Sequence, residues 1–213
     1  WVDPASQEGR DHIIAISKRT IDAGFDEINY DYIRFPTDGQ LDAMTYPAWD
    51  GQTPRSEIIK NFSAQARKEL KEYAPDVSLS MDIFGYAFLN DDGLGIGQHL
   101  EYLLSEFDFV YPMVYPSHYS AGNFGFQNPA EHPYEVIKGT IEKGLDQLGD
   151  KSELAKPKIS PWLQVFNMGA KYTPEMIKKE IQATYDSLVD KSTGWLLWDP
   201  SNKYERAKEY LNP

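Results

Sequence analysis

Two aspartates have the residue type and the spacing of a pair of carboxyl groups that could act together. Asp31 lies late in segment 25–36 (FDEINYDYIRFP) and Asp82 lies late in segment 77–84 (VSLSMDIF), and both segments alternate in polarity as β-strands do. Adjacent strands lie about 4.8 Å apart, so the two carboxyl groups can face one ligand. Crowding two acids favours the neutral form of one of them, which makes it a proton donor. The alternative is a structural role, in which one of the two aspartates pairs with Arg34 or accepts a hydrogen bond from a loop amide.

The two aspartates differ in their sequence neighbours, and this predicts different roles. Arg34 follows Asp31 closely and would hold it ionised if the two side chains meet, as suits a nucleophile or base. Asp82 lies between Met81 and Ile83, an apolar setting that favours the neutral form and suits a proton donor. We therefore predict that Asp31 and Asp82 are the catalytic residues.

Further polar and aromatic residues fall near the ends of predicted strands, where ligands bind in α/β folds. The predicted substrate-binding residues are Asp3, Asn29, Arg34, Tyr115, His118, Trp162, Gln164, Trp198 and Asp199. Tryptophan rings suit a sugar platform, but barrel cores also use tryptophan. Asp199 precedes Pro and Ser, a common turn sequence, and His118 lies in a long loop, so structural roles stay open for both.

Five segments carry the alternation with period two that is typical of β-strands. They cover residues 25–36, 77–84, 107–115, 158–166 and 194–199. In the first of them, Ile28, Tyr30 and Tyr32 share a face that suits packing against a helix. Asn29 and Asp31 therefore lie on the opposite face, where a buried carboxylate needs a reason to be present.

Helices are predicted between these strands from apolar residues at helical spacing. The first starts at a cap formed by Ser6 or Asp11 and ends at Gly24, and Thr173 followed by Pro174 starts another. The others cover about residues 56–73, 99–105, 134–148 and 204–211. Strand and helix therefore alternate, which indicates a parallel sheet with helices outside it.

Polar side chains on one face of nearly every strand favour a barrel interior over an open sheet. A complete (β/α)8 barrel of the TIM type takes roughly 250 residues, whereas this chain has 213 residues and begins with WVDP, which reads as a strand end. We predict an α/β fold that is an incomplete barrel, one domain over residues 1–213 that covers about the fourth to eighth βα units. A five-stranded open sheet is the alternative. The incomplete barrel would have open edges at Tyr30 and Trp195 unless another segment completes it.

Composition narrows the classes of function. The net charge is −12 and no basic stripe is present, which argues against nucleic acid as a partner. The chain has no cysteine, no apolar run of membrane-spanning length, and no HExxH or GxSxG motif. We therefore expect no metal site, no cofactor and no membrane span. Trp1 stands where a starting methionine would, so we expect a mature or truncated chain.

Several segments together resemble a known family. They are WVDP, FDEINYDYIRFPTDG, LSMDIFG, FDFVYPMVYPSHY and GWLLWDPSN, and the likeness extends over essentially the whole chain. The chain resembles the putative glycoside hydrolase domain of the DUF4015 group, whose members look like TIM-barrel glycosidases, often bacterial and exported. The resemblance implies that Trp1 follows the third barrel strand and that the five strands are the fourth to the eighth.

The chain is also similar, more faintly, to the chitinase-like barrels, whose fourth strand reads like FDGIDIDWEYP. The three acids of that motif fall on Asp26, Asn29 and Asp31, and the catalytic glutamate falls on Ile33. The general acid of that family is therefore absent, which argues against substrate-assisted chemistry of the chitinase type. The other positions that match this family are Met113, Tyr115 and Trp198.

The resemblance and the paired carboxyl groups together imply a glycoside hydrolase that cleaves O-glycosyl bonds in a polysaccharide or oligosaccharide, since such enzymes use two carboxyl groups beside the scissile bond. The expected partners are a carbohydrate substrate and a missing N-terminal segment that completes the barrel. The expected location is extracellular or on the bacterial cell surface. Ile33 stands where the chitinase-like barrels have their catalytic glutamate, and this supports an alternative: a barrel that binds carbohydrate without cleaving it.

Overall fold

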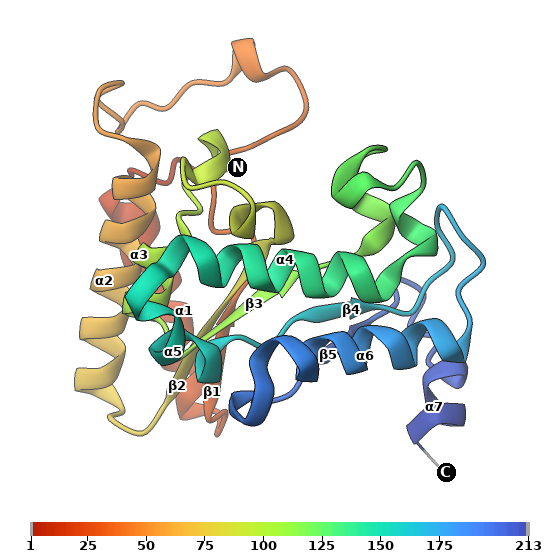
Figure 1. The fold of residues 1–213 in the computed structure, drawn as a ribbon. Coiled ribbons are helices and arrows are strands. Elements are labelled where there is room, and N and C mark those ends of the chain that lie inside the picture. Colours follow the sequence, from red (N-terminus) through yellow and green to blue (C-terminus); the bar gives the residue numbers. More distant parts are fainter. Residues whose placement is uncertain (1, 212–213) are drawn as a thin grey trace. The chain divides into compact units, whose positions relative to one another are not determined.

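The computed structural model describes residues 2–211, with side chains described as far as Lys208 (Figure 1). Trp1, the first residue of the predicted strand end, lies outside the described residues. The next residues form a turn and not a strand, because the carbonyl oxygen of Asp3 accepts the N–H of Ser6 at 2.9 Å. This turn leads directly into the first helix.

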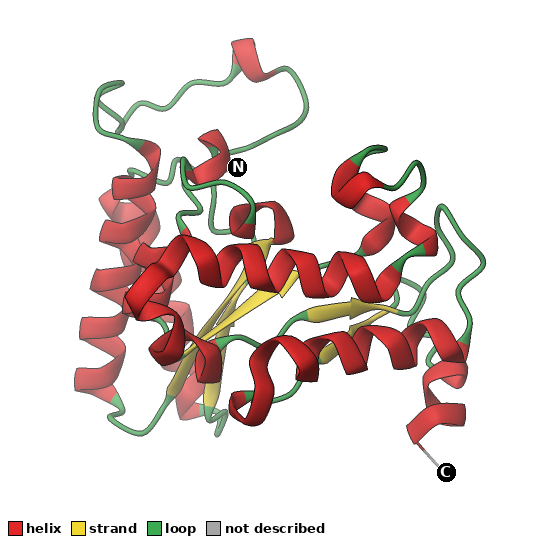
Figure 2. Ribbon diagram, viewed as in Figure 1, coloured by secondary structure: helices red, strands yellow, loops and turns green. Residues whose placement is uncertain are grey.

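Five strands are present in the part of the chain that the structure describes. They are β1 (Glu27–Tyr30), β2 (Ser78–Phe84), β3 (Phe109–Met113), β4 (Trp162–Gln164) and β5 (Leu196–Trp198). The strands form one sheet in the order β1-β2-β3-β4-β5, and β1 with β2, β3 with β4, and β4 with β5 pair in parallel. Helices alternate with these strands (Figure 2). The fold is therefore α/β and corresponds to an incomplete (β/α) barrel, because five strands do not close an eight-stranded ring.

Seven α-helices lie in the same described range, and several short 3₁₀ turns fill the loops. The helices are α1 (Gln7–Asp22), α2 (Arg55–Tyr73), α3 (Leu100–Glu106), α4 (Pro133–Leu148), α5 (Ser152–Ala155), α6 (Pro174–Leu188) and α7 (Glu205–Leu211). The side chain of Ser6, and not that of Asp11, caps α1 by accepting the N–H of Gly9 at 3.1 Å. Thr173 caps α6 with Pro174 in its first turn, as predicted.

The chain divides into two compact units. The first unit contains the residues up to Ile83 together with Asn90–Val110, and the second contains Phe84–Leu89 and the residues from Tyr111 onward. The boundary therefore passes through β3.

The core of the first unit is built on the apolar face of β1. The ring of Tyr30 meets that of Phe62 on α2 edge-on at 5.4 Å between centroids, and its hydroxyl group lies 2.8 Å from the Oγ of Ser17 on α1. Ile28 is buried on the same face. Burial raises the pKa of Tyr30 to about 12, so its hydroxyl group stays protonated at neutral pH. This face of β1 thus packs on helices, as predicted.

The long loop 37–54 of the first unit is attached to the start of α2. The guanidinium carbon of Arg55 lies 4.8 Å from the ring centroid of Phe35, 5.9 Å from that of Tyr46 and 5.2 Å from that of Trp49. Its Nη1 also donates to the carbonyl oxygen of Gly95 at 2.6 Å. Cation–π contacts of this kind are worth about 0.5–2 kcal/mol each, so Arg55 fastens the loop.

Helices α4 and α6 lie side by side in the second unit (Figure 1). Both helices have a buried face that is mostly apolar, and Phe88 packs directly against Gly144 of α4. A Cβ atom added at Gly144 would lie 2.0 Å from the Cδ1 of Phe88. Glycine at this position therefore permits the close approach of the ring.

Candidate active site

The two predicted catalytic aspartates lie at the carboxyl ends of neighbouring strands in the first unit. The register pairs Asn29 with Ser80 and Tyr30 with Met81, so the next position along each strand is occupied by Asp31 and Asp82. Asp82 lies within β2 and is 7% exposed, whereas Asp31 follows the last residue of β1 and is exposed. In parallel α/β folds this edge of the sheet is where ligands bind.

A ladder of polar side chains joins the two strands on this face. The amide nitrogen of Asn29 donates to the Oγ of Ser80 at 3.0 Å and to the Oδ1 of Asp82 at 3.2 Å. The Oγ of Ser80 in turn donates to the Oε1 of Glu27 at 2.5 Å. Buried polar groups need such partners, so the ladder explains how Ser80 and Asp82 are accommodated. Sequence reasoning missed Glu27, although its alternation with Asn29 and Asp31 could have identified it.

The chain turns sharply directly after Asp31. Tyr32 has a φ of 59°, which is uncommon for a residue with a side chain, and its ring is 61% exposed. The Oδ1 of Asp31 accepts the N–H of Tyr32 at 2.7 Å and thereby supports this turn. The prediction that Tyr32 shares the helix-facing side of the strand is therefore wrong, because the regular strand ends at Tyr30.

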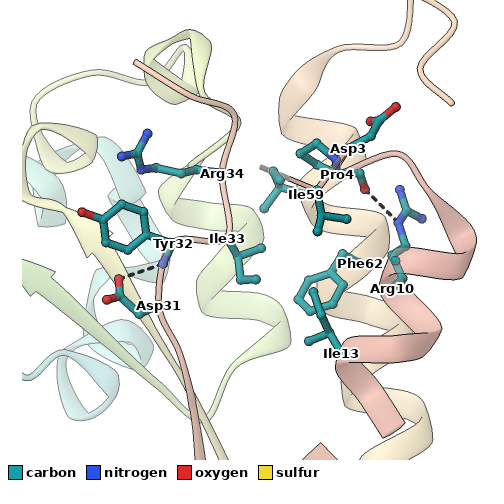
Figure 3. A pocket seen from close by; sticks show the side chains of 12 residues that line it. Asp3, Pro4, Arg10, Ile13, Asp31, Tyr32, Ile33, Arg34, Ile59 and Phe62 are labelled. Carbon is teal, nitrogen blue, oxygen red and sulfur yellow. Dashed lines mark hydrogen bonds between the residues drawn. The ribbon is translucent and has the colours of Figure 1, made fainter. Parts of the chain in front are cut away.

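Arg34 is buried and is held by several groups of its own segment. Its Nη1 donates to the carbonyl oxygen of Phe35 at 3.0 Å, and its guanidinium carbon lies 4.9 Å from the centroid of the Tyr32 ring. In Figure 3 the Tyr32 ring lies between the guanidinium group of Arg34 and the carboxylate of Asp31. Whether Arg34 contacts a substrate stays a prediction.

A pocket of about 390 Å³ lies between this segment and helices α1 and α2 (Figure 3). Its walls are mainly apolar, and Ile33, Ile59 and Phe62 point toward one another across it. Asp31, Tyr32 and Arg34 point to the other side of their segment, away from these helices. Asp31 therefore borders the pocket, but its carboxylate points away from the helices that form the opposite wall.

Asp3 also borders this pocket, but its carboxylate is engaged by backbone groups. Its Oδ1 accepts the N–H of Ala5 at 2.9 Å, and its Oδ2 accepts the N–H of Ala48 at 2.8 Å. These bonds fasten loop 37–54 to the segment before α1. A structural function of Asp3 is therefore evident, and its predicted contact with substrate stays a prediction.

The second unit contains a larger and more polar pocket of about 740 Å³, which we call the ring-lined pocket. It lies where β3, β4 and β5 end and where the chain enters α7. Its lining residues include Tyr115, His118, Phe166, Trp198, Asp199 and Arg206. Four of the predicted substrate-binding residues are thus brought together in one pocket of this unit.

Three aromatic rings pack together at this pocket. The centroids of Tyr115 and His118 are 5.3 Å apart, those of Tyr115 and Phe166 are 5.7 Å apart, and those of His118 and Phe166 are 6.0 Å apart. The Nδ1 of His118 lies 3.1 Å from the Oγ of Ser117. Burial lowers the pKa of His118, so its ring is neutral at neutral pH.

Trp198 presents an exposed ring at the end of β5. It is 40% exposed and meets Trp162 edge-on at 6.0 Å between centroids. The adjacent Asp199 is buried, and its Oδ1 accepts the N–H of Ser201 at 2.7 Å. This is the turn that the Asp-Pro-Ser sequence indicated. The ring of Trp198 is thus accessible, and its predicted contact with a sugar stays a prediction.

Gln164 is fully buried at the end of β4. Its Oε1 accepts the N–H of Ser117 at 3.1 Å, and its Nε2 donates to the carbonyl oxygen of Phe166 at 3.0 Å. Both ends of its carboxamide therefore hold backbone groups. Sequence reasoning also missed Phe166 and Arg206, and the position of Phe166 at the end of the fourth predicted strand was the available signal for the first of them.

Within the described residues, no group of three or more His, Cys, Asp or Glu side chains is arranged to hold a metal ion. No described helix is long and apolar enough to span a membrane.

The fold and the carboxyl groups at the strand ends are those of a domain of the (β/α)-barrel class. Residues 1–204 match the family DUF4015, described as a putative glycosyl hydrolase domain, and the chain belongs to this family. No curated protein matches the chain in sequence.

Among solved structures, the chain is similar to the glycoside hydrolase domain of PgaB (BpsB) from Bordetella bronchiseptica, with a TM-score of 0.62 and 15% sequence identity. The similarity covers 98% of this chain but 62% of the other chain. It therefore supports the fold, and the incomplete barrel in particular.

Proposed function

We propose that the chain is a glycoside hydrolase domain that hydrolyses an O-glycosyl bond in an oligosaccharide or polysaccharide. Asp31 acts as nucleophile or base and Asp82 acts as proton donor. The observation that carries the proposal is the position of the two carboxyl groups at the ends of paired parallel strands, in a chain that belongs to a family of glycosyl hydrolase domains. Hydrolysis of glycosides by two carboxyl groups is the general mechanism of such enzymes.

The difference in hydration supports the assignment of roles. Asp82 is largely buried, which favours a neutral carboxyl group that can donate a proton to the glycosidic oxygen. Asp31 is exposed and accepts the N–H of Tyr32, as suits a carboxylate that attacks the anomeric carbon or deprotonates a water molecule. A separation of about 5–5.5 Å between the carboxyl groups would give retention of configuration, and one of about 6.5–9.5 Å would give inversion.

The test replaces each aspartate with asparagine and measures kcat on a glycan found by screening for released reducing ends. Both Asp31→Asn and Asp82→Asn should lower kcat by a factor of about 10² or more, because each removes a group that acts on the bond. An aryl glycoside with a good leaving group needs little protonation, so it should partly restore cleavage by Asp82→Asn but not by Asp31→Asn.

Asp76→Asn serves as the matched control, because Asp76 is exposed and lies before β2. It should keep the kcat of the natural chain. If Asp31→Asn or Asp82→Asn also keeps that kcat, the role assigned to that residue is wrong.

A second candidate function is carbohydrate binding without cleavage, which the ring-lined pocket of the second unit favours. Trp198→Ala should then weaken glycan binding, as measured by titration calorimetry, while Asp31→Asn leaves binding intact. Under this second reading, neither the natural chain nor any variant releases reducing ends. Hydrolysis by the natural chain would exclude it.

We further propose that an N-terminal segment completes the barrel beside β1 and that the domain acts outside the bacterial cell or on its surface. Support for the first part comes from the edge position of β1 and from the longer chain of the similar PgaB domain. The second part rests on the membership of the chain in its family. A chain extended upstream should unfold at a higher temperature than this one, and fractionation of the source cells should place it outside the cytoplasm. Equal melting temperatures would contradict the first part, and a cytoplasmic location would contradict the second.

A further inference from the structure

The carboxamide of Gln164 holds two segments of the ring-lined pocket at once. Its Oε1 accepts the N–H of Ser117, which precedes His118, and its Nε2 donates to the carbonyl group of Phe166. The side chain is fully buried and has no solvent contact of its own. The two rings whose segments it holds are 6.0 Å apart and belong to one cluster with Tyr115. A displacement of either segment would therefore change the wall of the pocket.

A buried carboxyl group on α6 holds the backbone of the same residue. Glu180 is fully buried, and its Oε1 accepts the hydroxyl group of Tyr172 at 2.5 Å, whereas its Oε2 has no hydrogen-bond partner among the described residues. The same carboxyl group lies against the backbone N–H of Gln164. Burial raises the pKa of Glu180 well above its ordinary value and so favours the neutral form of the group. A neutral carboxyl group differs little in shape from a carboxamide, which makes glutamine its closest replacement.

The same end of β4 is fastened on its other side. The N–H of Tyr172 donates to the Oδ1 of Asn167 at 2.9 Å, and the Nη1 of Arg206 donates to the same oxygen at 2.9 Å. The loop after Phe166 is thus tied both to the segment before α6 and to α7. The carboxamides of Gln164 and Asn167 thus hold the chain at Phe166 and directly after it.

We propose that Gln164 is a positioning residue of the ring-lined pocket and not a sugar contact, and that the carboxyl group of Glu180 holds it in place. The proposal refines the substrate-binding part of the proposed function. The test measures groups of the pocket itself and needs no substrate. A negative result for Gln164 can therefore be distinguished from a negative result for the glycosidase assignment.

The first measurement uses the natural chain. The N–H of Ser117 should be protected from hydrogen exchange, because its acceptor is a fully buried side chain. Exchange of the Ser117 amide at the rate of an unstructured peptide would overturn the proposal. This measurement does not depend on whether any variant folds.

The second measurement follows the titration of His118 by NMR, with its signal assigned by its loss in His118→Asn. Gln164→Met keeps the length of the side chain but removes both hydrogen bonds. The turn that carries His118 should then loosen and become hydrated, and the pKa of His118, which burial lowers, should rise toward its ordinary value. Gln182→Met makes the same change at an exposed position of α6 and should leave the titration unchanged.

The third measurement repeats the titration for Glu180. Glu180→Gln should titrate like the natural chain, whereas Glu180→Met should shift the pKa of His118 in the same direction as Gln164→Met. Far-UV circular dichroism at each pH checks that every variant is folded. An unchanged His118 titration in folded Gln164→Met would overturn the role of Gln164, and equal shifts in the two Glu180 variants would overturn the role of the carboxyl group.

Discussion

Asn29 connects the two strands of the candidate active site, because its side-chain amide donates to both Ser80 and Asp82 of β2. Removing it leaves Asp82, which is largely buried, with one donor fewer. Asn29→Ala should therefore lower the free energy of unfolding by about 1–3 kcal/mol, the cost of losing a partner of a buried polar group. Urea unfolding monitored by fluorescence measures this change.

Asn29→Asp keeps the shape of the side chain but puts a second carboxyl group against Asp82. Two carboxyl groups in contact do not both ionise readily, so the folded pair keeps a proton that the unfolded chain releases, and this variant should lose more stability at about pH 7.5 than at about pH 4.5. Asn61→Asp adds the same charge at an exposed position of α2 and is the control. An equal loss at both pH values would contradict the close contact of Asn29 with Asp82.

At the residue scale, strand alternation was enough to predict that Asn29 and Asp82 face the same side. It could not predict Tyr32, because a φ of 59° directly after Asp31 ends the period-two pattern. The hydrogen bonds of Gln164 could not be predicted from the sequence either. Both of its partners are backbone groups, and one of them, the N–H of Ser117, is 47 residues away along the chain.

At the element scale, helix α4 contains two glycines that face aromatic rings. Alanine is the better helix former by about 1 kcal/mol, but at Gly144 its Cβ would lie 2.0 Å from the buried ring of Phe88. Gly144→Ala should therefore lower the free energy of unfolding by about 1–3 kcal/mol, as overpacking in a core does. Thermal or urea unfolding gives the change.

Gly139→Ala is the matched comparison on the same helix. Its Cβ would lie 2.6 Å from the ring of Phe124, which belongs to a loop and is not fully buried. This ring can move, so the cost should be clearly smaller than at Gly144. If Gly144→Ala proves the more stable of the two variants, the packing of Phe88 against α4 is wrong.

Helices were predicted more closely than strands, and the reason lies in their ends. Ser6 and Thr173 cap α1 and α6 through their own hydroxyl groups, so short sequence signals mark where these helices begin. The ends of strands depend on pairing with a neighbour. Segment 158–166 contributes only Trp162–Gln164, because Pro161 has no N–H to offer to a ladder.

At the scale of the whole molecule, Glu180 should make stability depend on pH. The folded chain keeps its proton while the unfolded chain releases it above the ordinary carboxyl pKa, so unfolding releases a proton in this range. The stabilising contribution is complete below that pKa and is lost as the pH rises toward the folded pKa. The slope can reach about 1.4 kcal/mol per pH unit.

Glu180→Gln removes this titration, so its stability relative to the natural chain should rise as the pH increases above the ordinary carboxyl pKa. Urea unfolding at several pH values measures the difference, and Glu135→Gln, at an exposed position of α4, is the control. A difference that stays constant with pH would mean that Glu180 does not carry a proton in the folded chain.

The overall architecture was predictable because the strands repeat a period-two polarity pattern and the helices a helical one, in alternation. The five parallel strands and the similarity to the PgaB domain confirm the incomplete barrel. The chain divides into two compact units, and the prediction that residues 1–213 form one domain stays a prediction.

The attachment of loop 37–54 makes proteolysis a reporter of loop opening. Trypsin cleaves after arginine, and a protease needs several residues around the bond in an extended, accessible form. Arg55 is the side chain that the rings of Phe35, Tyr46 and Trp49 hold, so cleavage after it requires this contact to break first. The bond after Arg55 also lies in the first turn of α2, so the rate of cutting there would report how often the loop is released and this turn unwinds. A ligand that binds on the loop would slow the cut.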